Sequence, residues 1–337
     1  MKRKRARTAT SPSPKRLFLL GSIALVAVAA AAFALQPQAE ETVPIGELSQ
    51  RTHVHGIAVD PKDPSRIYLA THHGLFGVSA DGTATRLSEV QDFMGFTPHP
   101  TDPEVLYASG HPASGGNLGF IASTDQGRTW TQISPGVNGP VDFHQMDASP
   151  AAPDLIYGAY GGGLQVSRDA GRSWEQAGPA PRKLIDLAAS AANADRLYAA
   201  TETGLLVSSD AGKIWEALLT GAPVSMVEVT PDGVLYAFVV GRGLVRAEEP
   251  PLNLRTVGDG FGQDYILHLA ADPADPNRLF AVTGNGRILA STDQGKNWAA
   301  FGGEVQDVVL AEAVADRPQV ERRLLRANQP AADHESV

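Results

Sequence analysis

Histidine is concentrated in one stretch of the chain. The sequence of 337 residues contains nine His, and seven of them lie between positions 53 and 144. Neutral imidazole nitrogens together with carboxylate oxygens suit Zn²⁺, and a Met thioether sulfur shifts the preference toward copper. The chain has no Cys, which excludes disulfides, thiolate catalysis and Cys-ligated metals. Metal chemistry in this protein therefore depends on whether the fold brings several of these His together.

A repeated pattern, S-x-D-x-G-x-x-W, identifies the structural elements that must position these His residues. The Asp of this pattern stands at positions 125, 169, 210 and 293, so the spacings are 44, 41 and 83 residues, the last being two periods. Two degenerate copies fill the series, one at Ser79–Gly82 and one near Arg246–Glu249. The four full copies are Ser123–Trp130, Ser167–Trp174, Ser208–Trp215 and Ser291–Trp298.

Each of the six units follows one plan of four short strands. An apolar strand comes first, then a turn such as Asp60–Pro64, a second strand, a Gly-containing turn, and a third strand that enters the repeated motif before the fourth. Four strands in about 40 residues, repeated along the chain, are typical of a β-propeller blade. The sequence predicts an all-β propeller of six blades, with seven as the alternative. The first strands are expected to start near Ile57, Phe96, Met146, Leu187, Val227 and Leu269.

The motif resembles the Asp box (BNR repeat) of sialidases, sortilin-type receptors, photosystem II stability factors and related glycosidase-like proteins. The resemblance rests on the four full copies and covers roughly residues 50–301. It implies the propeller fold. It implies no single function, because the proteins that share this repeat do unrelated things.

The residues of the Asp box have a structural explanation. A tight turn leaves backbone N–H groups without partners in the sheet, and Asp and Ser oxygens can accept them. Gly permits the positive φ that such a turn needs. The Trp is expected to cover the turn and fill space between blades. We therefore assign a structural and not a catalytic role to Asp125, Asp169, Asp210, Asp293, Trp130, Trp174, Trp215 and Trp298.

The repeat also predicts where a functional site lies. Because strands alternate in direction, the start of each first strand and the loop between the second and third strands share one face, here called the top. Asp92 belongs to the top-face group and His73 adjoins it, whereas His99 falls in a turn on the opposite face. Two interpretations remain open: a copper or zinc site, and a polar channel mouth whose His bond to neighbouring loops. The candidate ligands are His53, His55, His72, His111 and His144, with Met94 and Asp142 as further candidates.

Glycoside hydrolysis is the enzymatic alternative. It needs two carboxylates about 5–10 Å apart, and the top-face candidates are Asp92, Asp142 and Glu202. A sialidase-like enzyme would also need a cluster of Arg, but the Arg of this chain are scattered, and all four Trp belong to Asp boxes. No nucleophile-elbow pattern G-x-S-x-G is present. The sequence thus favours a binding module over an enzyme, and a scaffold for a protein partner, of sortilin or photosystem-assembly type, stays open as a further alternative.

The N-terminal segment differs from the rest of the chain. Residues 1–16 carry seven Lys or Arg and no acid, and an uncharged apolar run of 19 residues follows from Leu17 to Leu35. At 1.5 Å per residue, that run is about 28 Å long as a helix, close to the roughly 30 Å of a bilayer core. We expect a membrane anchor with the remainder outside. A cleaved signal peptide, with Ala32 and Ala34 near the cleavage site, is the alternative.

These observations divide the chain into five parts. After the basic segment (1–16) and the apolar segment (17–35), residues 36–50 are expected to form a linker and to supply a strand that closes the last blade. Residues 51–313 form the predicted propeller, in which Val305–Ala313 would begin a seventh blade if one exists, and 314–337 form a polar tail.

The charge of the exported part argues against nucleic-acid binding. The whole chain has a net charge of −9, and without the seven N-terminal basic residues it carries 21 basic against 37 acidic residues, or −16. Phosphate binding needs a basic surface. The expected partners are therefore a metal ion, a membrane or extracytoplasmic protein, and the membrane itself through the N-terminal helix.

Overall fold

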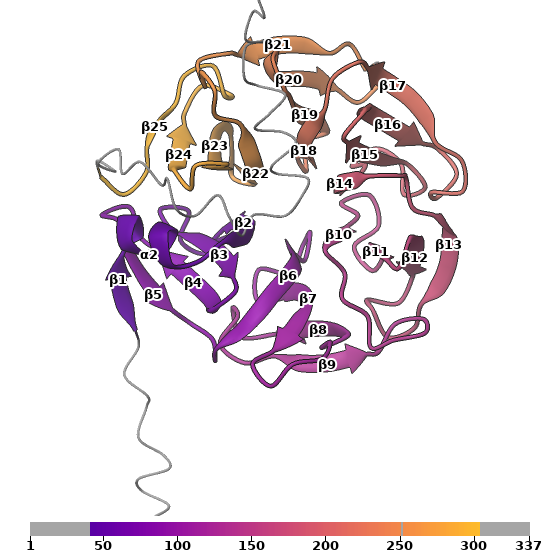
Figure 1. Cartoon of the computed structure of the whole chain (residues 1–337), viewed down its shortest axis with the longest axis horizontal. Helices are drawn as coiled ribbons and strands as arrows, with labels where there is room; N and C mark the ends of the chain where they lie inside the picture. The colour runs from indigo at the N-terminus through magenta and orange to yellow at the C-terminus, as the bar shows by residue number, and fades with distance from the viewer. Residues whose placement is uncertain (1–40, 251, 304–337) are drawn as a thin grey trace, which may run out of the picture. The chain divides into compact units, whose positions relative to one another are not determined.

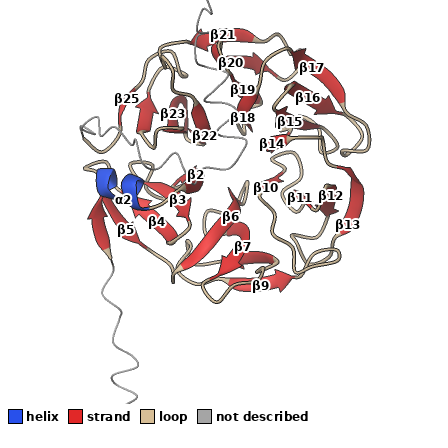
Figure 2. Ribbon diagram, viewed as in Figure 1, coloured by secondary structure: helices blue, strands red, loops and turns tan. Residues whose placement is uncertain are grey.

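Six β-sheets stand around a central channel like the blades of a propeller. The computed structural model describes residues 41–250 and 252–303, and Figures 1 and 2 show the six sheets in chain order around the ring. Five sheets have four antiparallel strands and the first has five. The fold class predicted from the repeat is thus confirmed, with six blades in the described residues.

The strands of each blade run outward from the channel in sequence order. Blade one contains β2 (Val54–Val59), β3 (Ile67–Thr71), β4 (Gly74–Val78) and β5 (Thr83–Arg86), and blade two contains β6 (Gln91–Pro98), β7 (Leu106–Pro112), β8 (Phe120–Ser123) and β9 (Thr131–Ser134). Blade three contains β10 (Gln145–Ala148), β11 (Ile156–Tyr160), β12 (Gly163–Ser167) and β13 (Glu175–Pro179).

The second half of the ring repeats this order. Blade four contains β14 (Leu184–Ala189), β15 (Leu197–Thr201), β16 (Gly204–Ser208) and β17 (Glu216–Thr220), and blade five contains β18 (Val224–Val229), β19 (Val234–Val239), β20 (Gly243–Glu248) and β21 (Arg255–Gly258). Blade six contains β22 (Ile266–Asp272), β23 (Asp275–Thr283), β24 (Ile288–Ser291) and β25 (Ala299–Ala300). Most innermost strands start two to five residues before the predicted apolar positions.

The segment before blade one takes a different place from the one expected. β1 (Thr42–Pro44) pairs antiparallel with β5, with Thr42 opposite Thr85, so it adds a fifth strand to the first blade and none to the last. The short helix α2 (Ile45–Arg51) follows and buries Ile45 and Leu48. The expectation that this segment pairs with the last blade is therefore wrong.

Apolar packing joins blade six to blade one. One buried cluster combines Ile45 and Leu48 with Phe280, Val282 and Phe301 of the last blade. Gly82 lies so close to Gly302 that a Cβ on Gly82 would collide with the Gly302 carbonyl oxygen. The ring thus closes through side-chain burial and close backbone approach.

A repeated aromatic residue fills the space between neighbouring sheets. The second strand of every blade carries Tyr or Phe at one equivalent position, and each of these side chains is at most 3% exposed. Burying such a ring contributes about 1.5–3 kcal/mol, so the repeat supplies one large apolar contact per blade. The residues are Tyr68, Tyr107, Tyr157, Tyr198, Tyr236 and Phe280.

The Asp boxes are hydrogen-bonded turns between the third and fourth strands. In blade two, Asp125 accepts hydrogen bonds from the Thr129 backbone N–H (2.9 Å), the Thr129 hydroxyl (2.7 Å) and the Ser123 hydroxyl (2.8 Å). Gln126 and Gly127 both have positive φ, 61° and 83°, and the Trp130 indole N–H donates to the Gly127 carbonyl at 2.9 Å. The oxygens of Asp125 are thus occupied within the turn itself.

The two degenerate boxes differ from each other. In blade one, Asp81 keeps part of the pattern, since it accepts from the Ser79 hydroxyl at 2.7 Å and from the Thr83 N–H at 3.0 Å. In blade five the motif is lost. Glu249 there accepts from the Tyr198 hydroxyl (2.5 Å) and the Ala191 N–H (3.0 Å), and so contacts blade four.

Several predicted segments lie outside the described residues. They are the basic segment 1–16, the apolar run 17–35, the candidate seventh-blade strand Val305–Ala313 and the tail 314–337. Within the two described ranges, no helix has the length and apolar character needed to cross a bilayer.

Candidate functional site at the channel mouth

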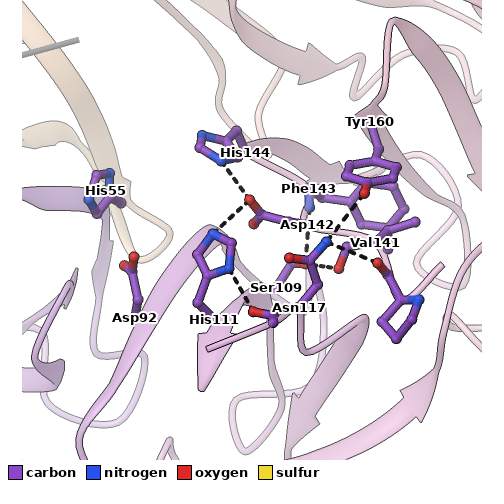
Figure 3. A network of polar contacts seen from close by, with 12 residues as sticks. His55, Asp92, Ser109, His111, Asn117, Val141, Asp142, Phe143, His144 and Tyr160 are labelled. Atoms are coloured by element: carbon purple, nitrogen blue, oxygen red, sulfur yellow. Dashed lines mark hydrogen bonds and ion pairs between the residues drawn. The ribbon is translucent and has the colours of Figure 1, made fainter. Parts of the chain in front are cut away.

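The central channel forms a cavity of about 860 Å³. The first strands of all six blades line it, and the predicted ligands His53, His55, His72, Met94, His111 and His144 are among the lining residues. Figure 3 shows part of its mouth, where side chains of blades one, two and three approach each other. Six predicted residues from three blades thus lie around one cavity.

One group of side chains joins blade one to blade two. In this blade-one cluster (His55, His72 and Asp92), the Nε2 atoms of His55 and His72 are 3.1 Å apart, and His72 Nδ1 lies 2.9 Å from Asp92 Oδ2. An ionised carboxylate only accepts hydrogen bonds, so His72 carries its proton on Nδ1 and its Nε2 has a free lone pair. His55 then donates from Nε2, so one proton lies between the two rings.

A second group joins blade two to blade three. In this blade-three cluster (His111, Asp142 and His144), one oxygen, Asp142 Oδ2, lies 3.0 Å from His111 Nε2 and 2.6 Å from His144 Nε2. His111 Nδ1 lies 2.8 Å from the Gly116 carbonyl oxygen, which can only accept. A neutral His111 would therefore point its Nε2 lone pair at a carboxylate. The arrangement requires a positive charge, either a second proton on His111 or a metal ion.

The backbone around Asp142 is held by buried neighbours. Val141 and Phe143 are both 0% exposed, and the Ser109 hydroxyl accepts the Phe143 N–H at 3.0 Å. Phe143 packs on Trp174 with ring centroids 4.8 Å apart. Because Val141 and Phe143 are fixed in the core, the residues that alternate with them, Asp142 and His144, point toward the channel mouth (Figure 3).

The carboxylates of both clusters have unused oxygens. Asp142 is 7% exposed, and its Oδ1 is buried without a hydrogen-bond partner; Asp92 Oδ1 is in the same state. A buried carboxylate oxygen without a partner is costly, because it has lost water and gained nothing in return. Both oxygens are therefore candidate ligands for a cation.

The environment shifts the pKa of two cluster His in opposite directions. Burial, followed by the neighbouring His72, His268, His144 and His53, lowers the pKa of His55 well below its usual value. The hydrogen bond to Asp142 raises the pKa of His144 against the effect of burial. Near neutral pH, His55 is therefore uncharged, whereas His144 holds a proton more tightly than a free imidazole does.

The remaining predicted residues occupy varied positions. His53 packs edge-on against His72 with ring centroids 5.7 Å apart, and Met94 lines the cavity while only 7% exposed. His53 belongs to neither of the two clusters. His99 also lines the cavity, but it directly follows β6 and so lies at the opposite end of that strand from Asp92, where its Nδ1 accepts the backbone N–H groups of Thr101 and Asp102 at 3.1 and 3.0 Å.

Sequence reasoning missed a channel histidine in blade six. His268 lines the cavity and its Nε2 lies 3.1 Å from the Val54 carbonyl oxygen, while burial lowers its pKa to about 4. The same register shift occurs at the start of the first strand in blades one, four, five and six, so Leu267 is the residue equivalent to His55. His268 is the next residue along the strand, and both Leu267 and His268 line the cavity.

Three acidic side chains deeper in the channel were also missed. Asp147 accepts the Ala189 N–H at 2.8 Å and Asp186 accepts the Val227 N–H at 3.0 Å, so each bonds to the next blade. Burial raises the pKa of Asp147, raises that of Asp186 to about 7, and, with both Asp nearby, raises that of Glu228 well above its usual value. Their signal in the sequence was an acid within the first strand of three successive blades.

The carboxylates considered for hydrolysis all contact basic side chains. Asp92 and Asp142 bond to His as described, and Glu202 forms an ion pair with Lys183 at 2.7 Å. A glycosidase pair needs one carboxyl group that can donate a proton and one that can act as base or nucleophile. Each of these three groups instead has a basic side chain on one of its oxygens.

Comparison with known proteins identifies the fold. No protein-family model matches the chain, and no curated protein matches its sequence. Among solved structures, it is similar to the GH74 enzyme of Niastella koreensis, with 15% identity and a TM-score of 0.55 over 74% of this chain and 45% of that one. It is also similar to the extracellular domain of a hybrid two-component system from B. thetaiotaomicron, with 14% identity and a TM-score of 0.52 over 81% of this chain and 36% of that one.

A further similar structure is YCF48 bound to D1 peptide, with 17% identity and a TM-score of 0.47 over 79% of this chain and 86% of that one. The chain spans less than half the length of the GH74 and two-component proteins it resembles. Likeness at such low identity concerns the fold alone. The chain thus has the β-propeller fold found in the GH74 enzymes and in the extracellular domain of that two-component system.

Proposed function

We propose that the protein is a binding module whose channel mouth holds a transition metal, zinc or copper. The observation that carries the proposal is the arrangement around Asp142. The Nε2 atoms of His111 and His144 lie 3.0 and 2.6 Å from one oxygen of Asp142. The Nδ1 of His111 is hydrogen-bonded to the Gly116 carbonyl oxygen. A metal ion supplies the positive charge that this geometry requires.

The ligand types and the surroundings fit such an ion. Imidazole and carboxylate suit zinc and copper, and a carbonyl that accepts from the non-ligating ring nitrogen orients a metal-binding His in many proteins. Three protein ligands, of which His111 and His144 line the cavity, leave a coordination position open. The site would thus bind an ion that remains accessible from the channel.

The competing explanation is a proton in place of the metal. If His111 and His144 were both protonated, they would satisfy Asp142 without an ion. The two explanations differ in metal affinity, because a hydrogen-bonded mouth would bind zinc or copper no more tightly than a surface His pair does.

Metal titration separates these explanations. The full chain would be purified in detergent without a His tag, and calorimetry and elemental analysis would be performed with zinc and with copper. The test variant is His111→Ala/His144→Ala, and the control is His99→Ala on the opposite face. We expect tight binding by the natural chain and the control, and weakened binding by the test variant. Binding of zinc and copper by the natural chain no tighter than that of a surface His pair would overturn the proposal.

We further propose that the propeller lies outside the cytoplasmic membrane. The basic segment 1–16 and the apolar run from Leu17 to Leu35 support this placement. Immunoblots of membrane and medium fractions test it: an anchored chain stays with membranes, whereas a cleaved chain appears in the medium at lower mass. Recovery in the cytosol would contradict both forms of the proposal.

A further inference from the structure

We propose that the channel mouth holds two metal ions, one in each cluster, and not one ion shared by both. This inference rests on the proposed metal-binding function and specifies its stoichiometry. Its first support is that the possible ligand atoms fall into two separate groups of three. Within each group all the atoms lie within 4.8 Å of one another, and no residue belongs to both groups.

The two imidazole nitrogens of the blade-one cluster are already nearly as far apart as two ligand atoms around a bound ion. Ligand atoms about 2.0 Å from a tetrahedral ion are about 3.3 Å from each other. In the blade-one cluster, the Nε2 atoms of His55 and His72 are 3.1 Å apart. An ion would replace the proton between them.

The blade-one cluster has its own orienting carboxylate. Asp92 Oδ2 holds the Nδ1–H of His72 at 2.9 Å, so the lone pair of Nε2 is directed toward His55. A carboxylate that accepts from the far nitrogen of a ligating His fixes its tautomer and raises its basicity.

The blade-three cluster is complete without any of these groups. Asp142 Oδ2 lies within 3.0 Å of the Nε2 atoms of both His111 and His144, and Asp142 Oδ1 is buried without a partner. An ion here would be bound by two imidazoles and one carboxylate. Each cluster thus contributes one negative charge, which offsets part of the repulsion between two neighbouring cations.

The strand pairing places the two clusters next to each other. Asp92 and His111 are directly opposite residues on β6 and β7, so one member of each cluster stands on the same pair of strands. Opposite residues of an antiparallel pair have Cα atoms about 4.5–5.5 Å apart. Figure 3 shows Asp92 and His111 at the mouth with His55, Asp142 and His144. The two ions would therefore be close enough to interact magnetically.

The test counts ions and measures their proximity. The full chain in detergent would be loaded with zinc, desalted and submitted to elemental analysis, alongside His72→Ala, His144→Ala and the control His99→Ala. We expect two ions per chain for the natural protein and the control, and one for each single variant. Loading with Cu²⁺ should give a dipolar-broadened electron paramagnetic resonance spectrum that becomes a simple mononuclear spectrum in each single variant.

The other possible numbers of ions per chain distinguish failure of the two-ion inference from failure of the proposed function. Circular dichroism of the variants checks that they keep the propeller fold, and His72→Gln and His144→Gln replace any variant that does not. One ion in the natural chain, whether lost in both variants or only in one, overturns the two-ion inference and leaves metal binding intact. No ion in the natural chain overturns the proposed function as well.

Discussion

Asp92 and His111 are directly opposite each other on β6 and β7, yet their side chains contact the blades on opposite sides of blade two. Asp92 accepts from His72 of blade one at 2.9 Å, whereas His111 contacts Asp142, just before blade three, at 3.0 Å. One cross-strand pair in blade two therefore connects three blades at the channel mouth. The clusters on either side of it can be changed separately, which makes their roles testable.

Replacing Asp142 by Asn should weaken the blade-three cluster selectively. Asn keeps the size of the side chain but removes the charge and one acceptor oxygen, so both His lose their anionic partner. We expect zinc affinity at this cluster to fall roughly 100-fold. Competition with a chelating dye measures the change. Glu202→Gln, at another top-face carboxylate, is the control, and an equal loss in both variants would contradict the assignment.

The loop that holds His111 should tune the same cluster. Asn117 donates from Nδ2 to the Pro140 carbonyl at 3.0 Å and to the Tyr160 hydroxyl at 3.3 Å, next to the Gly116 carbonyl that orients His111. We expect Asn117→Ala to reduce zinc affinity about 10-fold at the blade-three cluster. In a His72→Ala background, calorimetry would isolate this effect, and an unchanged affinity would show that the loop does not position His111.

Removing an Asp-box carboxylate should cost stability without affecting metal binding. Asp125 accepts hydrogen bonds from Thr129 and Ser123, and Asp125→Ala leaves the Thr129 N–H without its partner. We expect the free energy of unfolding in urea to fall by about 1–3 kcal/mol. Asp259→Ala, at an exposed position after β21, should change it by less than about 0.5 kcal/mol. Altered zinc stoichiometry in Asp125→Ala would contradict a purely structural role.

The contribution of the ring-closing contact to stability can be measured by comparing Ala variants at two glycines. Gly82 and Gly233 both have a φ of 82°, but a Cβ on Gly82 would collide with the Gly302 carbonyl oxygen, whereas nothing lies within 4 Å of one on Gly233. Both Ala variants should lose about 1–2 kcal/mol from backbone strain. Gly82→Ala should lose about 1–3 kcal/mol more from the collision. Equal urea midpoints would mean that this approach does not contribute to closing the ring.

The channel acids should make stability depend on pH. Burial raises the pKa of Asp186 from 3.8 to about 7, so its contribution is fully present below about pH 4 and is lost as pH rises through 7. In Asp186→Asn, which cannot ionise, this loss is absent. Relative to the natural chain, the variant should gain up to about 4 kcal/mol between pH 4 and pH 8.

Urea unfolding of metal-free protein at several pH values measures this difference. Asp259→Asn is the matched control, and it should follow the natural chain at every pH. Asp147 and Glu228 face the same channel and remain in both proteins, so some pH dependence persists in Asp186→Asn. Parallel pH profiles for Asp186→Asn and the natural chain would show that Asp186 ionises normally in the folded state.

The sequence alone determined the blades, because an Asp box is complete within eight residues. Its hydrogen bonds run between Ser123, Asp125 and Thr129, and its positive φ angles fall on Gln126 and Gly127, so local chemistry leaves a visible pattern. The concentration of His before position 144 likewise pointed to the channel mouth. A repeat that buries one aromatic residue per blade then leaves little freedom in the overall architecture.

Only the tertiary structure decided how the His are distributed between the two clusters and which contacts close the ring. Register shifts on the inner strands, such as those between Val54 and Gly56 and between Ile266 and His268, change which side chains face the channel, and no local pattern marks them. Ile45 and Leu48 are buried in a cluster that contains residues of both the first and the last blade, and β1 pairs with the first. The bond from His111 to Asp142 spans two blades, and such a contact depends on how sheets pack.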